Sequence, residues 1–230
     1  MAVANAFDTK GELKKRTRSV LVIYKDKIIA EKYDMGFNKD SKILGWSMTK
    51  SVTSTLFGIL QKQGKYDIYK PVPIPEWQKD KRKIITTNDL LHMNSGLEWK
   101  EHYDKICDAT QMLFLAENMG KVQRDKPAAF KPNSHWNYSS GTTNLLSGIL
   151  RSQFKTHQEY LDFWYSALID KIGMNSMVVE TDRAGNYVGS SYSWATTRDW
   201  AKFGLLYLHK GNWNGTQLFD ESWAKYVIPF

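Results

Sequence analysis

The chain has 230 residues, of which 42% are hydrophobic and 24% are charged, and this composition indicates a soluble globular protein that can bury a core. Its one cysteine, Cys107, excludes an internal disulfide, and its five scattered histidines lack the spacing of a zinc site, so we expect no metal and no cofactor. No apolar run approaches the roughly 18 residues of a membrane span.

The net charge is +8, and the basic residues cluster at 10–18 and 79–83. We interpret both clusters as solvated surface segments and expect no nucleic-acid partner, because no binding motif accompanies them. The charge favours anionic substrates. The chain as written has no signal peptide and would be cytoplasmic, or periplasmic or secreted if a leader was removed, so the compartment stays open, as does the oligomeric state.

The first predicted elements are two strands. Residues 19–24 and 27–33 are rich in β-branched and aromatic side chains, and Lys25-Asp26 separates them. This pattern predicts a β-hairpin.

A helix is predicted from Met48, because apolar residues then recur at helical spacing, and Gly64 is its expected end. The apolar positions of this helix are Met48, Val52, Leu56, Ile59 and Leu60. Residues 69–77 contain three prolines and predict an extended connection.

The middle of the chain is predicted to be mostly helical. Thr87 is the expected cap of a short helix with Asp89 in its first turn, and residues 94–96 would end it. Residues 101–120 are predicted as a further helix.

Three more helices are predicted in the second half. Residues 130–152 form a loop and then a helix, whose apolar stripe is Leu145, Leu146, Ile149 and Leu150. Residues 158–170 form another. Residues 196–211 have a threonine cap, Asp199 in the first turn and Gly211 after the end.

Strands therefore come first and helices follow, and two strands alone make a poor sheet. We expect residues 1–230 to form one incomplete domain that lacks its C-terminal strands. Residues 1–64 would hold the first strands and helix, 65–185 a mostly helical subdomain, and 186–230 a return to the α/β part.

The start of the first long helix carries a candidate catalytic pair, Ser47 and Lys50. Residues three apart share a helix face, so the lysine amine can reach the serine hydroxyl and act as a base if burial lowers its pKa. The spacing alone is weak, because 17 serines and 25 lysines predict roughly two matches by chance. The chain has three such matches: Ser47/Lys50, Ser152/Lys155 and Ser222/Lys225.

Sequence context favours Ser47, which alone lies between a strand pair and a strongly apolar helix. Ser152 follows the apolar stripe of the helix predicted within 130–152 and lies in the polar segment at its end. Ser222 lies in a predicted capping segment. A Ser-His-Asp arrangement is less favoured, because Thr49 stands where a nucleophile elbow has glycine.

A second candidate element is "NYSSGTTN" at 137–144, a turn before a helix that contains Tyr138 and Ser140. A tyrosine hydroxyl can shuttle protons where a neighbouring cation lowers its pKa. Taken alone, Tyr138 would be interpreted as a packing aromatic.

Four segments together resemble the serine β-lactamase-related family: "WSMTKS" (46–51), "NDLLHMNSGLEW" (88–99), "KPNSHWNYSSGTTNLLSGIL" (131–150) and "GSSYSWATTRDWAKFGLLYL" (189–208). The nearest branch is the class C-like one, with its esterases and 6-aminohexanoate-dimer hydrolases. The resemblance runs from about residue 19 to 230. It implies an α/β (α+β) fold, a mainly antiparallel sheet flanked by helices plus a helical subdomain, with the active site between them.

The resemblance also implies residue roles. Ser47 would be the acylated nucleophile, Lys50 would help take its proton, and Tyr138 would act with the lysine in proton transfer. Ser140, a candidate binding residue, stands where class C β-lactamases have asparagine, which favours the esterase and amide hydrolase branch. The substrate would be a small ester or amide, with a β-lactam left open.

One family element has no match: a Lys-Thr-Gly or His-x-Gly-like segment that we expect beyond residue 230, on the strand that supplies one oxyanion-hole N–H. The N–H of Ser47 would supply the other, and loss of one donor can cost about 10²–10³ in rate. A catalytically silent binding module on the same scaffold is therefore the alternative. Four aromatic residues flank the motifs and are candidate binding residues, or equally core residues: Trp46, Trp136, Tyr192 and Trp194.

Overall fold

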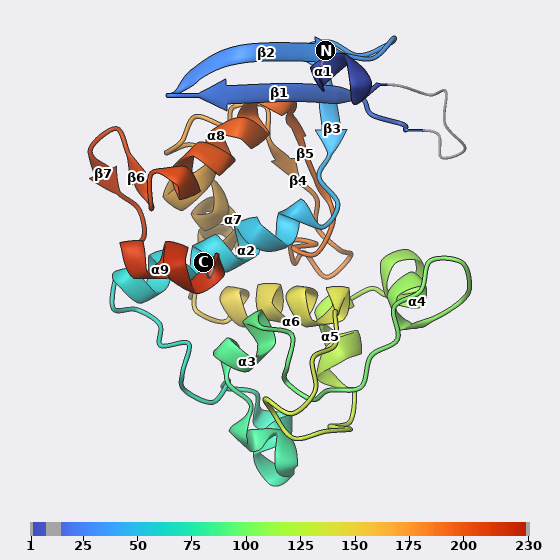
Figure 1. Cartoon of the computed structure of the whole chain (residues 1–230). Coiled ribbons are helices and arrows are strands. Elements are labelled where there is room, and N and C mark those ends of the chain that lie inside the picture. Colours follow the sequence, from blue (N-terminus) through green and yellow to red (C-terminus); the bar gives the residue numbers. More distant parts are fainter. Residues whose placement is uncertain (1, 8–14, 229–230) are drawn as a thin grey trace.

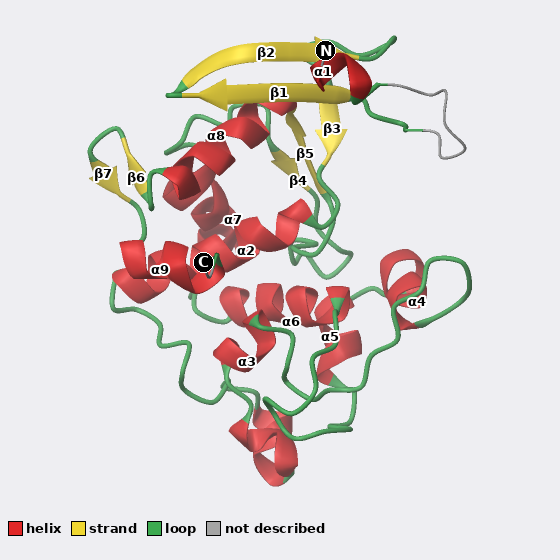
Figure 2. Cartoon of the chain, viewed as in Figure 1, coloured by secondary structure: helices red, strands yellow, loops and turns green. Residues whose placement is uncertain are grey.

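The computed structural model describes residues 2–7 and 15–228, so residues 10–14 of the first basic segment lie outside the described part. Figure 1 shows the strands β1 to β5 at one end of the molecule, two long helices across its middle, and short helices at the other end. Figure 2 shows the same division by colour, with helices and loops alone in the lower part.

The predicted hairpin is confirmed. Strand β1 (Ser19–Tyr24) pairs antiparallel with β2 (Lys27–Tyr33), after a short helix α1 (Ala2–Asn5). Lys25 and Asp26 have φ values of 48° and 61°, and two consecutive left-handed residues form the tight turn that matches the twist of a hairpin.

A second sheet has three short strands in the spatial order β3 (Lys42–Leu44), β5 (Ser193–Thr196) and β4 (Val178–Val179). All its pairs are antiparallel, as expected for this fold. A small hairpin of β6 (Asn212–Trp213) and β7 (Thr216–Gln217) lies apart. Strands of two to four residues are too short to produce a recognisable period-2 pattern, so the sequence did not predict them.

Two predicted helices, α2 (Met48–Lys62) and α6 (Ser140–Arg151), form the centre of the core. Gly64 ends the first as predicted: its φ is 66° and its N–H donates to the Gln61 carbonyl at 2.9 Å. The predicted stripe of α6 is buried. Their completely or almost completely buried side chains include Val52, Leu56, Phe57, Leu146 and Leu150.

The later helices cover the sheet side of the core. Helix α7 (His157–Trp164) continues as a π-helical turn η3 (Tyr165–Ile169), and α8 (Thr197–Leu208) precedes α9 (Glu221–Val227). The helices predicted at 158–170 and 196–211 are thus confirmed. In the described ranges, none of the helices combines the length and hydropathy needed to cross a bilayer.

The helical part of the fold contains α3 (Thr87–Leu91), α4 (Asp108–Leu115) and α5 (Met119–Arg124), with 3₁₀ turns η1 (Pro75–Lys79) and η2 (Lys81–Ile84). These short helices pack around α6 in the lower half of Figure 1. The division of the chain at residues 64 and 185 stays a prediction.

The predicted cap of α3 is wrong by one residue. Thr86 has extended backbone and its Oγ1 accepts the Asp89 N–H at 3.1 Å, while the Asp89 carboxylate accepts the Thr86 N–H at 2.8 Å. This reciprocal pair is a capping box. Thr87 is instead buried, with its hydroxyl 2.6 Å from that of Tyr66.

The helix predicted over 101–120 is also wrong in part. Residues 101–107 are a loop, α4 begins only after Cys107, and the extended connection predicted over 69–77 turns into η1 at Pro75. Most side chains of 101–107 are exposed, so no buried apolar face favours a helix there. Proline at the first helical position is well suited to start the 3₁₀ turn.

Candidate active site

The turn from β3 into α2 positions Ser47. The Gly45 N–H donates to the Ser193 carbonyl of β5 at 2.7 Å, and a Cβ on Gly45 would lie 2.4 Å from Cζ2 of Trp200. Only glycine permits this approach to α8. Trp46 then adopts a left-handed conformation (φ 44°), which is costly for a residue with a side chain and is typical of functional turns.

Ser47 and Lys50 are in contact at the start of α2. Lys50 Nζ donates to Ser47 Oγ at 3.1 Å, as the three-residue spacing predicts. The same amine lies 3.1 Å from Ser140 Oγ and 2.8 Å from the Ser190 carbonyl oxygen. Ser47 is exposed and Lys50 is half-buried, so a substrate can reach the hydroxyl while the amine is shielded.

Burial lowers the pKa of Lys50 from its ordinary value of 10.5 to about 8, although the negative charge of Glu101 opposes the change. At pH 7 roughly a tenth of such amines are neutral. A neutral amine next to a hydroxyl can take its proton, so the geometry and the pKa of Lys50 suit a general base.

The other two Ser-x-x-Lys matches have ordinary structural contacts. Ser152 Oγ donates to the Ile149 carbonyl at 2.6 Å, at the end of α6. Lys225 forms an exposed ion pair with Glu221 at 3.1 Å, one turn earlier on α9. Neither contact resembles the convergence of acceptors on Lys50.

Tyr138 lies next to the pair, with Lys50 Nζ 5.0 Å from its ring centroid. Burial raises the pKa of Tyr138, a hydrogen bond with Ser47 opposes this, and the charge of Glu101 raises the pKa further. The lowered pKa considered from the sequence is therefore wrong, because burial outweighs the hydrogen bond with Ser47. Tyr138 is therefore a neutral phenol at pH 7.

A buried polar scaffold holds the acceptors of Lys50 in place. The Ser190 N–H donates to Oδ1 of Asn144 on α6 at 3.0 Å, and the Ser193 hydroxyl is 2.6 Å from that of Thr49 on α2. These contacts join Ser190, before β5, to α6 and the first residue of β5 to α2. The Ser190 carbonyl is thereby fixed beneath Lys50.

Glu101 is a site residue that the sequence did not single out. Its Oε1 accepts the Ser140 hydroxyl at 2.8 Å and its Oε2 accepts the Ser140 backbone N–H at 2.7 Å. Tyr103 and Trp99 donate to the same carboxylate. Burial of Glu101 opposes ionisation, but these hydrogen bonds outweigh it and hold its pKa below the ordinary value. Its only sequence signal is its place two residues after the "NDLLHMNSGLEW" segment.

The four predicted aromatic residues do not all lie together. Trp46 is half exposed and packs edge-on against Tyr192, with ring centroids 6.4 Å apart. Trp136 is exposed beside Tyr138 at the same centroid distance. Trp194 follows Ser193 on β5, so strand alternation points it to the opposite face, where its indole donates to Glu180.

Comparison with known proteins identifies the family of the chain. The sequence model of the beta-lactamase family matches residues 3–225. The chain belongs to the beta-lactamase family.

The most similar members of this family include a 6-aminohexanoate-dimer hydrolase of Paenarthrobacter ureafaciens, 23% identical over 227 residues, or 92% of this chain and 57% of that protein. A putative 6-aminohexanoate-dimer hydrolase from Bacillus anthracis has a structure similar at a TM-score of 0.79, with 22% identity over 90% of this chain and 58% of that one. A D-amino acid amidase from Ochrobactrum anthropi gives 0.67, with 18% identity over 90% and 68%. The chain thus spans little more than half of the curated relative.

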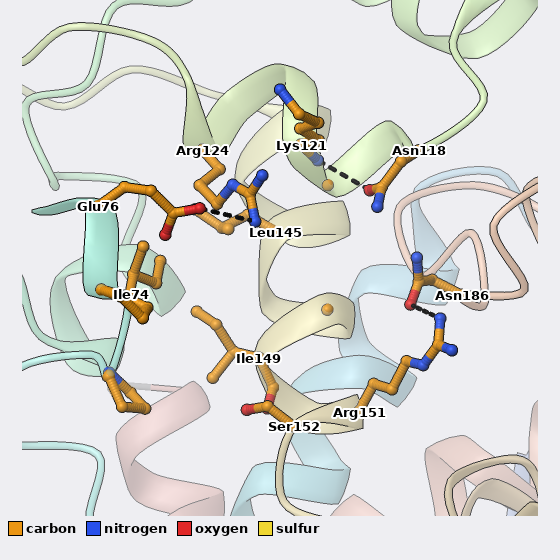
Figure 3. Close-up of a pocket in the computed structure, with 14 residues that line it drawn as sticks. Ile74, Glu76, Asn118, Lys121, Arg124, Leu145, Ile149, Arg151, Ser152 and Asn186 are labelled. Carbon is orange, nitrogen blue, oxygen red and sulfur yellow. Dashed lines mark hydrogen bonds and ion pairs between the residues drawn. The ribbon is translucent and has the colours of Figure 1, made fainter. Parts of the chain in front are cut away.

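The structure also holds a cavity of about 300 Å³ further along α6, shown in Figure 3. Apolar side chains of Ile74, Leu145 and Ile149 line it, and Arg124 lies across from Glu76 at 3.3 Å. None of Ser47, Lys50 and Tyr138 lines this cavity. This cavity is therefore separate from the candidate catalytic residues.

Proposed function

We propose that this beta-lactamase-family chain is a serine hydrolase that cleaves an ester or amide through an acyl-enzyme on Ser47. The observation that carries the proposal is the 3.1 Å contact between Lys50 Nζ and Ser47 Oγ, with burial lowering the pKa of that amine to about 8. Among the three lysines with this spacing, Lys50 alone combines burial with a converging set of acceptors.

In the first step neutral Lys50 takes the Ser47 proton as Oγ attacks the substrate carbonyl carbon. The carbonyl π electrons move to oxygen, and a tetrahedral oxyanion forms. The N-terminus of the 15-residue helix α2 favours this negative charge. The N–H of Ser47 has no recorded acceptor within the described ranges and is the expected first donor to the oxyanion.

Collapse of the intermediate breaks the bond to the leaving group. The leaving nitrogen or oxygen takes a proton from the Tyr138 hydroxyl, which recovers one from the Lys50 ammonium, so both groups return to their starting forms. Burial keeps Tyr138 protonated, which supports its role as the donor in this step.

In the second step water attacks the acyl carbonyl and gives its proton to Lys50. Collapse returns that proton to Ser47 and releases the carboxylic acid. The names of relatives, an amide-dimer hydrolase and an amino acid amidase, support a linear amide as the first substrate class to test. The exposed rings of Trp46 and Trp136 flank the nucleophile and suit an apolar part of the substrate.

The test is covalent labelling. The chain is incubated with a fluorophosphonate, and intact mass and peptide mapping locate the adduct. One adduct on Ser47, absent from Ser47→Ala and retained in Ser222→Ala, is expected. A chain that folds but stays unlabelled would instead support the silent binding module.

A further inference from the structure

Glu101 has no free hydrogen-bonding capacity. Each carboxylate oxygen accepts two hydrogen bonds: Oε2 from the Trp99 indole (2.7 Å) and the Ser140 backbone N–H (2.7 Å), and Oε1 from the Tyr103 hydroxyl (2.5 Å) and the Ser140 hydroxyl (2.8 Å). A carboxylate offers about four acceptor positions, so all are occupied. Glu101 therefore does not hold a proton and has no position left for a cationic substrate.

This arrangement determines what Ser140 can do. A serine hydroxyl has a single hydrogen, and in Ser140 that hydrogen points to Glu101. Toward Lys50 Nζ, at 3.1 Å, Ser140 can only accept. The Ser190 carbonyl, at 2.8 Å, can also only accept.

The same restriction applies to Lys50. A neutral amine has two hydrogens and one lone pair, and two obligate acceptors, Ser140 and Ser190, take the two hydrogens. The lone pair is then left for the third neighbour, the Ser47 hydroxyl at 3.1 Å. A base that must take the Ser47 proton needs this orientation.

We propose that Glu101 is a positioning residue that acts through Ser140: by holding the Ser140 proton, it makes Ser140 an obligate acceptor and directs the Lys50 lone pair to Ser47. The proposal rests on the proposed function for its catalytic consequence, but its structural part concerns Lys50 alone. The hydrogen bonds of Glu101 go to Trp99, Tyr103 and Ser140, and none goes to Ser47.

The charge of Glu101 provides a second, separable signature. Two successive hydrogen bonds, of 2.8 Å and 3.1 Å, connect its carboxylate to Lys50 Nζ, so the charges lie less than about 6 Å apart. The other titratable groups around them are Tyr138 against Lys50 and Tyr103 against Glu101, and both phenols have raised pKa values. Within residues 2–7 and 15–228, Glu101 is the one negative charge that raises the pKa of Lys50.

The experiment compares Glu101→Gln with Glu98→Gln. Glu98 is exposed on the same segment, so its variant removes the same charge without touching Ser140. The fluorophosphonate labelling rate is measured from pH 6 to 10. In Glu101→Gln we expect a plateau roughly 10- to 100-fold lower, since a misdirected base loses much of its effect. The alkaline rise of the rate should move about one pH unit lower.

Action through Ser140 is tested with Ser140→Ala. If Glu101 acts through this hydroxyl, the double variant loses little more than the slower single variant. If the rate losses of Glu101→Gln and Ser140→Ala multiply in the double variant, Glu101 does not act through Ser140. A merely structural role of Glu101 would change thermal unfolding, and its rate loss would multiply with that of Ser140→Ala instead of being shared with it.

A readout independent of labelling separates failure of this inference from failure of the proposed function. The NMR signal of the Lys50 side chain, assigned by its loss in Lys50→Met, is titrated in the whole chain. Its midpoint should fall by about one pH unit in Glu101→Gln and stay in Glu98→Gln. If the chain is not labelled but the Lys50 midpoint shifts, the acyl-enzyme alone is refuted. If the chain is labelled but Glu101→Gln changes neither the labelling rate nor the Lys50 midpoint, the positioning role alone is refuted. If the chain is not labelled and the Lys50 midpoint does not shift, both the acyl-enzyme and the positioning role are refuted.

Discussion

Replacement of Lys50 by methionine is expected to stabilise the fold at neutral pH while removing the base. Burial lowers the pKa of Lys50 from 10.5 to about 8, and a difference of this size corresponds to about 3 kcal/mol of unfavourable burial of the charged amine. Methionine has a similar length and no charge. The substitution also removes the Lys50 amine that donates to the Ser190 carbonyl at 2.8 Å. An unpaired carbonyl there costs about 1–2 kcal/mol of folding free energy. The net expectation at pH 7 is a gain of about 1–2 kcal/mol.

The pH dependence makes this prediction specific. Below pH 8 the amine is charged in both the folded and unfolded chain, so the folded state has the full burial cost. Between pH 8 and 10.5 the unfolded chain binds more protons than the folded chain, so the stability of unaltered protein rises with pH. The advantage of Lys50→Met should therefore shrink by about 3 kcal/mol up to pH 10.5, and it should reverse sign at pH ~9.

Urea unfolding at several pH values from 7 to 10.5 measures the difference. Lys65→Met, at an exposed lysine in the turn after α2, is the matched control and should show a difference that is flat with pH. A stability difference for Lys50→Met that stays constant over the whole range would refute the burial argument. Loss of Ser47 labelling in the same variant is expected.

Two further predictions concern glycines with opposite surroundings. Gly45→Ala should destabilise the fold by about 1–3 kcal/mol and slow Ser47 labelling, because the new Cβ would lie 2.4 Å from Trp200 Cζ2 and displace the turn before α2. Chemical unfolding and the rate of Ser47 labelling measure these effects. Unchanged values would contradict the argument that α8 approaches Gly45 too closely for a side chain. Gly148→Ala and Gly204→Ala, inside α6 and α8 with no atom within 4 Å of the new Cβ, should each stabilise by about 0.5–1 kcal/mol without changing labelling. A loss of stability in both would show that the helices do not tolerate the added methyl group.

Local signals in the sequence were reliable where neighbouring residues alone decide the structure. The hairpin around Lys25-Asp26, the end of α2 at Gly64 and the threonine cap of α8 all depend on turn and cap chemistry within a few residues. The cap of α3 was misplaced by one residue because Thr86 and Thr87 are both suitable caps. In the structure the Thr87 hydroxyl binds that of Tyr66, so Thr86 is the residue that caps α3.

The candidate site shows the same division. Ser47 and Lys50 are three residues apart on one helix, so their contact follows from helix geometry. Tyr138 could be placed by its motif, but burial sets the direction of its pKa change, and burial is a tertiary property. Trp194 shows the limit of motif proximity, since the face to which a strand residue points depends on the register of β5.

The sequence by itself determined the first hairpin, the long helices, the Ser47–Lys50 spacing and the family resemblance, because each depends on short-range periodicity or on ordered motifs. Only the tertiary structure brought Glu101 and Ser140, 39 residues apart, together beneath Lys50, and a further contact joins Lys50 to Ser190 over 140 residues. No local pattern encodes such contacts. The burial that lowers the pKa of Lys50 arises only when α2, α6 and the segment before β5 pack together, so the reactivity of the pair is a property of the fold.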